Sequence, residues 1–231
     1  MTKPLEVKEL YKAFGGLIAT NNISFDVEEG ESLALIGPNG AGKTTIFSQI
    51  MGEIKQTKGT ISLFGKEISG MSTAQRIREG VSRTYQVPRP FSDMSVAENI
   101  RVGLMPDNIW QMITQSTNVE RELELALSVG FHEDDLLRTP SELSMGDLRK
   151  LEMARTMATN PRVMLLDEVF AGLTVGEISQ IASLIQEMRN EGMTLLIVSH
   201  DLKALEPLVD RAVAIEQGTQ IAEGPFADVM A

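Results

Sequence analysis

The chain has 231 residues, of which 42% are hydrophobic, so it can bury a substantial core and is not a disordered segment. Its formal net charge of −11 argues against a broad nucleic-acid-binding surface and against direct adhesion to an anionic membrane. Cysteine is absent, which excludes disulfides and thiolate metal sites.

The first third of the chain predicts a mixed α/β core. Residues 1–10 lack the apolar run of a signal peptide, and no apolar run in the sequence approaches the roughly 20 residues that a membrane-spanning helix needs. A helix is expected from about 42 to 52. Apolar patterns also predict strands near residues 5–10, 22–27, 31–36, 59–64 and 81–86.

The pattern changes in the middle of the chain, where we expect an α-helical subdomain over residues 87–142. A proline-broken loop opens it, two segments with helical periodicity follow, and the residues between these segments are irregular. These parts are the loop 87–91, the helices 95–104 and 119–130, and the irregular stretch 105–117.

Strand and helix patterns return in the last third, so residues 1–86 and 143–231 are expected to form one α/β core around the inserted helices. Ser144 is a suitable N-cap for a helix, and Asp147 three residues later completes a capping-box pattern. Two buried strands and a terminal hairpin are predicted at 162–167, at 193–199 and around Gln217–Gly218.

The sequence GPNGAGKTT, residues 37–45, lies directly after an apolar strand and directly before a helix. Glycines and a lysine at this spacing, between a strand and a helix, are typical of a phosphate-binding loop. The pattern disfavours the alternative interpretation, a glycine turn without a ligand. Backbone N–H groups can cradle phosphates, Lys43 can reach the β- and γ-phosphates, and Thr44 can ligate Mg²⁺. The predicted nucleotide-binding residues here are Gly37, Pro38, Asn39, Gly40, Ala41, Gly42, Lys43, Thr44 and Thr45.

Four side chains elsewhere supply groups that hydrolysis of a Mg²⁺-nucleotide needs. Asp167 ends a buried strand where it can ligate the metal, and Glu168 follows where it can orient or deprotonate water. His200 ends another buried strand at the same sheet edge and could contact the γ-phosphate. Gln86 supplies a neutral amide that can reach metal or water, whereas the other histidine, His132, is expected to be exposed.

Together these residues resemble the ATP-binding subunits of ABC transporters, and the resemblance covers essentially the whole chain. It implies a P-loop NTPase (RecA-like) α/β core with an antiparallel β subdomain and an inserted α-helical subdomain. It makes Phe14 the aromatic that stacks on adenine, ahead of Tyr11. It implies a catalytic set of Glu168, His200 and Gln86, and metal ligands Thr44, Gln86 and Asp167.

The family's signature, usually Leu-Ser-Gly-Gly-Gln, falls on Leu143–Asp147. The resemblance implies that Ser144, Met145, Gly146 and Asp147 face ATP held by the other subunit of a head-to-tail dimer. Ser144 and Gly146 keep the hydroxyl and the backbone that would contact the partner's γ-phosphate. The opening of this helix is therefore predicted to face a second subunit.

Four positions depart from the family's usual residues, and two of them, Val169 and Thr174, leave open whether coupling across the dimer interface is weakened. A bulky residue at position 145 resembles the branched-chain amino acid uptake group, as do the stretches 83–99 and 170–173. The departures are Met145 for glycine, Asp147 for glutamine, Val169 for proline and Thr174 for aspartate.

The resemblance implies an ATPase subunit that powers uptake of a small solute, an amino acid or a related amide or urea. Its expected partners are a second ATPase subunit, identical or similar, permease subunits docking near Gln86–Val96 and, indirectly, a solute-binding protein, with no nucleic acid. It would then lie at the cytoplasmic face of the inner membrane. Two alternatives stay open: a non-transport ABC ATPase, and a regulatory module that dimerises on ATP with weak turnover. A GTPase is disfavoured because no Asn-Lys-x-Asp segment follows the phosphate loop.

Overall fold

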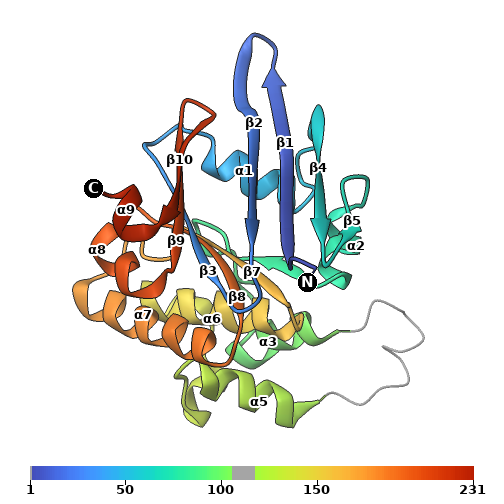
Figure 1. Ribbon diagram of the computed structural model, residues 1–231. Coiled ribbons are helices and arrows are strands. Elements are labelled where there is room, and N and C mark those ends of the chain that lie inside the picture. The colour runs from blue at the N-terminus through green and yellow to red at the C-terminus, as the bar shows by residue number, and fades with distance from the viewer. Residues whose placement is uncertain (1, 106–117) are drawn as a thin grey trace.

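The structure, a computed structural model, describes residues 2–105 and 118–231 as two sheets with helices packed on them (Figure 1). Apart from its first residue, the irregular stretch predicted at 105–117 lies outside the described residues. No helix within the described ranges is long and apolar enough to cross a membrane.

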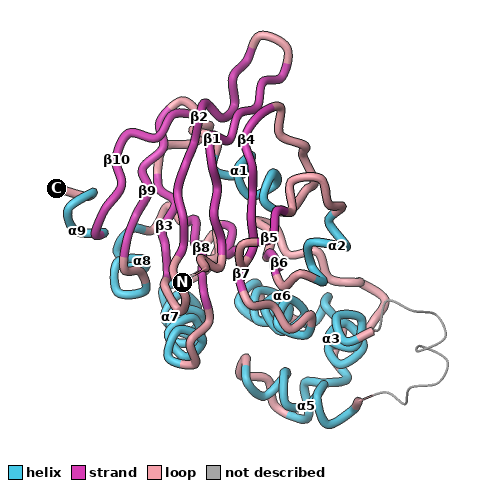
Figure 2. The backbone as a smooth tube through the Cα atoms, turned by 45° about the vertical axis from the view of Figure 1, so that its right-hand side comes forward, coloured by secondary structure: helices cyan, strands magenta, loops and turns pink. Residues whose placement is uncertain are grey.

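The smaller sheet is antiparallel, has the order β2-β1-β4-β5 and includes the N-terminal hairpin. The first two strands are longer than predicted, and they meet at a two-glycine turn where Phe14 pairs with Leu17. Their tips project beyond the rest of the molecule, with both of these side chains exposed, so no hydrophobic alternation marks them in the sequence (Figures 1 and 2). The strands are β1 Leu5–Phe14, β2 Leu17–Val27, β4 Lys58–Leu63 and β5 Lys66–Glu67.

The larger sheet has the order β10-β9-β3-β8-β7-β6 and is parallel except for β10. Every residue of β3, β7 and β8 is buried, as expected for parallel strands covered on both faces. The terminal hairpin is confirmed, because β9 and β10 pair around Gln217–Gly218, where both residues have positive φ. The strands are β3 Ser32–Ile36, β6 Val81–Arg83, β7 Val163–Asp167, β8 Thr194–Val198, β9 Arg211–Glu216 and β10 Thr219–Pro225.

The helices include the predicted one after the phosphate loop and two within the predicted helical insert. Three short helices, α2, α8 and α9, were not predicted. In α2, Ser72 and Gln75 form a capping box, but only Arg76 of its six residues is buried. The insert's limits at 87 and 142 stay a prediction. The helices are α1 Lys43–Ile50, α2 Thr73–Arg78, α3 Val96–Leu104, α5 Val119–Ser128, α6 Met145–Ala158, α7 Val175–Asn190, α8 Leu202–Leu205 and α9 Phe226–Val229.

The larger sheet separates two hydrophobic cores. Along β3, Ala34 and Ile36 belong to the core shared with α6 and α7, whereas Leu33 and Leu35 belong to the core shared with α1 and the antiparallel sheet. This alternation follows from the two-residue period of a strand. The phosphate loop follows β3 directly, and its Ala41 is buried in the core shared with α1.

β6 ends three residues earlier than the predicted strand 81–86. The Tyr85 N–H donates to Glu152 Oε1 at 2.7 Å, and Arg149 Nη1 donates to the Tyr85 carbonyl at 2.6 Å. The Thr84 N–H still donates to the Leu165 carbonyl of β7 at 2.9 Å, but the Tyr85 peptide groups bond to these side chains of α6, so the chain leaves the sheet at Tyr85. Gln86 consequently lies in a loop rather than at a strand end.

Candidate nucleotide site

The predicted phosphate loop joins β3 to α1 in the setting that the motif requires. Two of its glycines are needed because the loop passes close to neighbouring backbone. A Cβ at Gly37, whose φ is +149°, would lie 2.0 Å from the Ile215 carbonyl oxygen, and one at Gly42, with φ +107°, would lie 2.4 Å from that of Ala19. Any side chain at either position would displace the end of β9 or β2.

Lys43 lies across this loop. Its Nζ donates to the carbonyl oxygens of Gly37 at 2.6 Å and Pro38 at 2.9 Å. Burial lowers the pKa of the Lys43 ammonium, and the nearby Glu168 and Asp167 oppose that shift. The lysine is thus a buried cation held over the loop in which phosphates would sit.

An open cleft of about 600 Å³ extends from the loop. It brings together side chains that are far apart in the sequence, from the tip of β1 to the end of β8. Phe14 lines it, is 48% exposed and has the Lys12 Nζ 5.1 Å from its ring centre, whereas Tyr11 is not among the lining residues. The lining residues are Phe14, Leu17, Ile18, Ala19, Asn39, Gly40, Ala41, Gly42, Lys43, Thr44, Thr45, Gln86, Glu168 and His200.

Glu168 and His200 meet at the inner wall of the cleft. The His200 Nε2 lies 2.9 Å from Glu168 Oε1, and the glutamate side chain is 7% exposed against 50% for the histidine. Burial raises the pKa of Glu168, an effect that His200 and Lys43 only partly oppose. A carboxylate of raised basicity beside a phosphate loop is suited to accept a proton from water.

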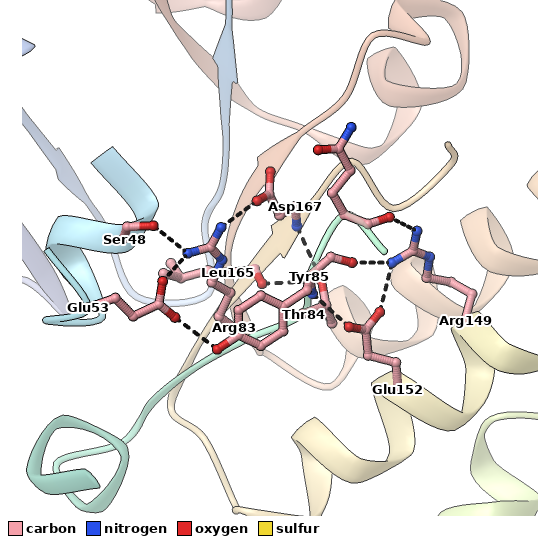
Figure 3. A network of polar contacts seen from close by, with 10 residues as sticks. Ser48, Glu53, Arg83, Thr84, Tyr85, Arg149, Glu152, Leu165 and Asp167 are labelled. Carbon is pink, nitrogen blue, oxygen red and sulfur yellow. Dashed lines mark hydrogen bonds and ion pairs between the residues drawn. The ribbon is translucent and has the colours of Figure 1, made fainter. Parts of the chain in front are cut away.

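Asp167 lies buried behind the cleft, at the end of β7. Its Oδ2 accepts a hydrogen bond from Arg83 Nη2 at 2.6 Å, while its buried Oδ1 has no partner among the described residues (Figure 3). An unpartnered carboxylate oxygen on a residue that interacts with Lys43 of the phosphate loop suits Mg²⁺, which takes one or two carboxylates and completes its shell with phosphates and water. The described residues contain no cluster of three or more acidic, histidine or cysteine ligands.

The signature residues open α6 away from this cleft, since none of 144–147 is among the described residues that line it. Ser144 is the N-cap, as predicted, and its Oγ accepts from the Asp147 N–H at 3.1 Å. The predicted capping box is only half formed: the Asp147 carboxylate accepts from the Ser144 hydroxyl at 3.1 Å and from Lys150 Nζ at 3.3 Å rather than from the Ser144 N–H.

A residue missed in the sequence, Glu177, ties the signature helix to α7. It forms a capping box with Thr174, and its Oε1 also accepts from the Gly146 N–H at 2.9 Å. These hydrogen bonds, led by that from the Thr174 backbone, lower the pKa of Glu177 to about 2. A Cβ at Gly146 would lie 2.7 Å from Glu177 Oε1, so this contact requires the glycine.

The fold and the groups gathered at the carboxyl ends of β3, β7 and β8 define a P-loop nucleoside triphosphatase. A family profile described as "ABC transporter" matches residues 20–171. The chain belongs to this family and is an ATP-binding, ATP-hydrolysing subunit of an ABC transporter.

Individual relatives support this membership. The chain is 39% identical over 238 residues to the high-affinity branched-chain amino acid transport ATP-binding protein LivG of Salmonella typhimurium, covering 97% of this chain and 92% of LivG. It is 37% identical to BraF of Pseudomonas aeruginosa, a protein of the same description, with the same coverage. A solved ATP-binding cassette of an ABC transporter in its ADP conformation superposes with a TM-score of 0.87 at 28% identity, covering 97% of this chain and 92% of that one.

Proposed function

We propose that this subunit powers the uptake of branched-chain amino acids, or of a related small solute such as an amide or urea. The observation that carries the proposal is the near full-length identity of 37–39% with subunits named for branched-chain amino acid transport. The test is ATP-dependent uptake of labelled leucine, urea and acetamide into vesicles containing this subunit with permease and solute-binding subunits from its own gene neighbourhood. ATP hydrolysis without uptake of any of the three would refute this substrate class.

Nucleotide binding would use groups that the structure already holds in place. Lys43 and the loop N–H groups bind the phosphates, and Phe14 stacks on the base. Thr44 and the free Oδ1 of Asp167 hold Mg²⁺, with Gln86 reaching it from the cleft wall. The bound Mg²⁺ would neutralise charge that develops on the phosphates during transfer.

Hydrolysis would depend on the Glu168–His200 pair. Glu168 accepts the proton of the attacking water, because its raised pKa makes it a better base than an exposed carboxylate. His200 holds the Glu168 carboxylate through Nε2 and, being half-exposed, can reach the γ-phosphate. Steady-state phosphate release measured with the isolated subunit tests this assignment and separates it from a weakly active regulatory module.

Two such subunits, identical or similar, would pair head to tail so that each signature helix meets the ATP of the other. Support comes from the position of α6: its N-terminus lies outside the chain's own cleft, and Met145 beside it is 43% exposed. A helix N-terminus and the Ser144 hydroxyl suit a γ-phosphate. Sedimentation with and without ATP tests this pairing.

The permease would dock at a groove of about 340 Å³ between α2, α3 and α6, beside the segment Gln86–Val96. Tyr85, Arg89 and Arg155 line the groove, and Phe91 at its rim is 43% exposed with the Arg155 guanidinium 4.9 Å from its ring centre. Half-exposed apolar and cationic side chains of this kind suit a protein partner. This docking would hold the subunit at the cytoplasmic face of the inner membrane, with only indirect contact to a solute-binding protein and none to nucleic acid.

A further inference from the structure

Arg83, at the end of β6, is a buried cation that joins three elements around the candidate metal aspartate. Its Nη2 donates to Asp167 Oδ2 at 2.6 Å, and its Nη1 donates to Ser48 Oγ at 3.0 Å and to Glu53 Oε2 at 2.9 Å (Figure 3). The Arg83 side chain is 4% exposed and that of Asp167 is 1% exposed. A planar guanidinium with donors in a fixed fork fixes the relative positions of its partners.

The Asp167 carboxylate is consequently held in one orientation. Its Oδ2 is occupied by Arg83, and its backbone N–H donates to Thr84 Oγ1 at 3.2 Å. Only Oδ1 lacks a partner among the described residues, so it alone is available to a metal. The guanidinium itself lies 5.7 Å from the ring centre of Phe47 and 5.0 Å from that of Tyr85, which restricts its movement.

The same network reaches the groove that we assign to the permease. The second oxygen of Glu53 accepts from the Tyr85 hydroxyl at 2.8 Å, and Arg83 and Tyr85 both line the groove. The Arg89 guanidinium lies 5.6 Å from the Tyr85 ring on the groove side. An unbroken chain of hydrogen bonds therefore runs from Tyr85 through Glu53 and Arg83 to Asp167.

We propose that Arg83 is a positioning residue that fixes Asp167 for the metal, and that Glu53 and Tyr85 hold Arg83 in turn, so that the metal site depends on the groove wall. This inference rests on the proposed role of Asp167 as a metal ligand. Partners that orient a metal-bound carboxylate typically contribute about 10- to 100-fold to metal affinity. Arg83→Lys would keep the positive charge, and hence its repulsion of the metal, but would remove the forked donors of the guanidinium that hold Asp167 and Glu53 together.

The test compares the affinities of Mn²⁺·ATP and of metal-free ATP in EDTA, together with the electron paramagnetic resonance spectrum of the bound Mn²⁺. Arg83→Lys should weaken Mn²⁺·ATP binding about tenfold and leave metal-free ATP binding unchanged. Tyr85→Phe, which keeps the ring and removes only the hydroxyl, should produce the same selective loss at about threefold, in keeping with one hydrogen bond. The matched control is Arg101→Lys, which alters an arginine pair with buried Glu122; neither residue lines the cleft, so the change should affect neither affinity.

A double-mutant cycle completes the design. In an Asp167→Asn background, Arg83→Lys should have no further effect on Mn²⁺·ATP binding, because Arg83 acts through that carboxylate. Three outcomes would overturn the inference and leave the proposed metal site intact. Arg83→Lys could still weaken Mn²⁺·ATP binding in the Asp167→Asn background, or it could weaken metal-free ATP binding equally. It could also have no effect although Asp167→Asn alone abolishes the metal dependence of ATP binding. If Asp167→Asn itself has no effect, the proposed metal site fails first. Thermal melting shows whether Arg83→Lys is misfolded. If it is, the effect of Tyr85→Phe on Mn²⁺·ATP binding tests the inference instead.

Discussion

Replacing Glu168 with glutamine should separate ATP binding from hydrolysis. The amide has nearly the same shape as the carboxylate, which is 7% exposed and 2.9 Å from His200, but it cannot accept a proton from water. Loss of a general base costs about 10²- to 10⁴-fold, so hydrolysis should fall at least about 100-fold, equivalent to ~2.7 kcal/mol of activation free energy. ATP should still bind, and an ATP-bound dimer should last longer.

The same substitution should stabilise the fold at neutral pH. Burial raises the pKa of Glu168 above its ordinary value of 4.5, so the folded chain holds this proton more tightly than the unfolded chain. As pH rises from 4.5 through the folded-state pKa, the ionising carboxylate therefore reduces stability, and glutamine avoids this loss. The Glu168→Gln protein should melt above wild type at pH 7, and the difference should disappear well below pH 4.5.

Phosphate release and thermal melting of the same preparations check both effects. Glu191→Gln, at an exposed carboxylate just after α7, is the control for removing a charge. Unchanged hydrolysis in Glu168→Gln would refute the assignment of the base. A lower melting temperature at pH 7 would refute the argument that burial dominates the electrostatics of this carboxylate.

Four further substitutions test the interfaces and the helix ends. Ser144→Arg should abolish ATP-dependent dimerisation in sedimentation without affecting ATP binding to the monomer. Asp147→Gln should tighten ATP-dependent dimerisation by no more than about threefold at low salt, because Lys150 already offsets the Asp147 charge. Dimerisation of Ser144→Arg would show that α6 does not face a partner's ATP. Phe91→Ala should weaken co-purification with the permease at unchanged nucleotide affinity, whereas unfolding would make Phe91 a packing residue. The pKa of Glu177 is lowered to about 2, so the ionised carboxylate stabilises the folded state fully above pH 4.5 and this stabilisation is lost as pH falls toward 2. Glu177→Gln should therefore melt at a lower temperature than wild type at pH 7, and the difference in melting temperature should disappear on acidification.

The parts of the site that the sequence predicted are local in the chain. The phosphate loop is a contiguous motif, and Asp167 and Glu168 directly follow a run of apolar residues that marks a buried strand. The parallel sheet then brings Glu168 and His200 together, because carboxyl ends of parallel strands share one edge.

The residues that the sequence did not indicate act through partners far along the chain. Arg83 reads as an ordinary polar residue in a short strand, and its partner Asp167 lies 84 residues away. Glu177 completes a recognisable capping box, but its bond to Gly146 spans 31 residues and exists only because α6 and α7 pack together. The half-formed cap at Asp147 was mispredicted because Lys150, one turn on, draws the carboxylate away from the Ser144 N–H.

The apolar tip of the N-terminal hairpin bears on which nucleoside the protein can select. At that end of the cleft the lining side chains are Phe14, Leu17, Ile18 and Ala19, none of which can donate or accept a hydrogen bond. Stacking recognises the flat face that all purines share, whereas discrimination between bases needs polar groups aimed at their edges. These side chains therefore give the cleft little means of rejecting guanosine triphosphate, so its preference for ATP over guanosine triphosphate should be modest in a competition assay.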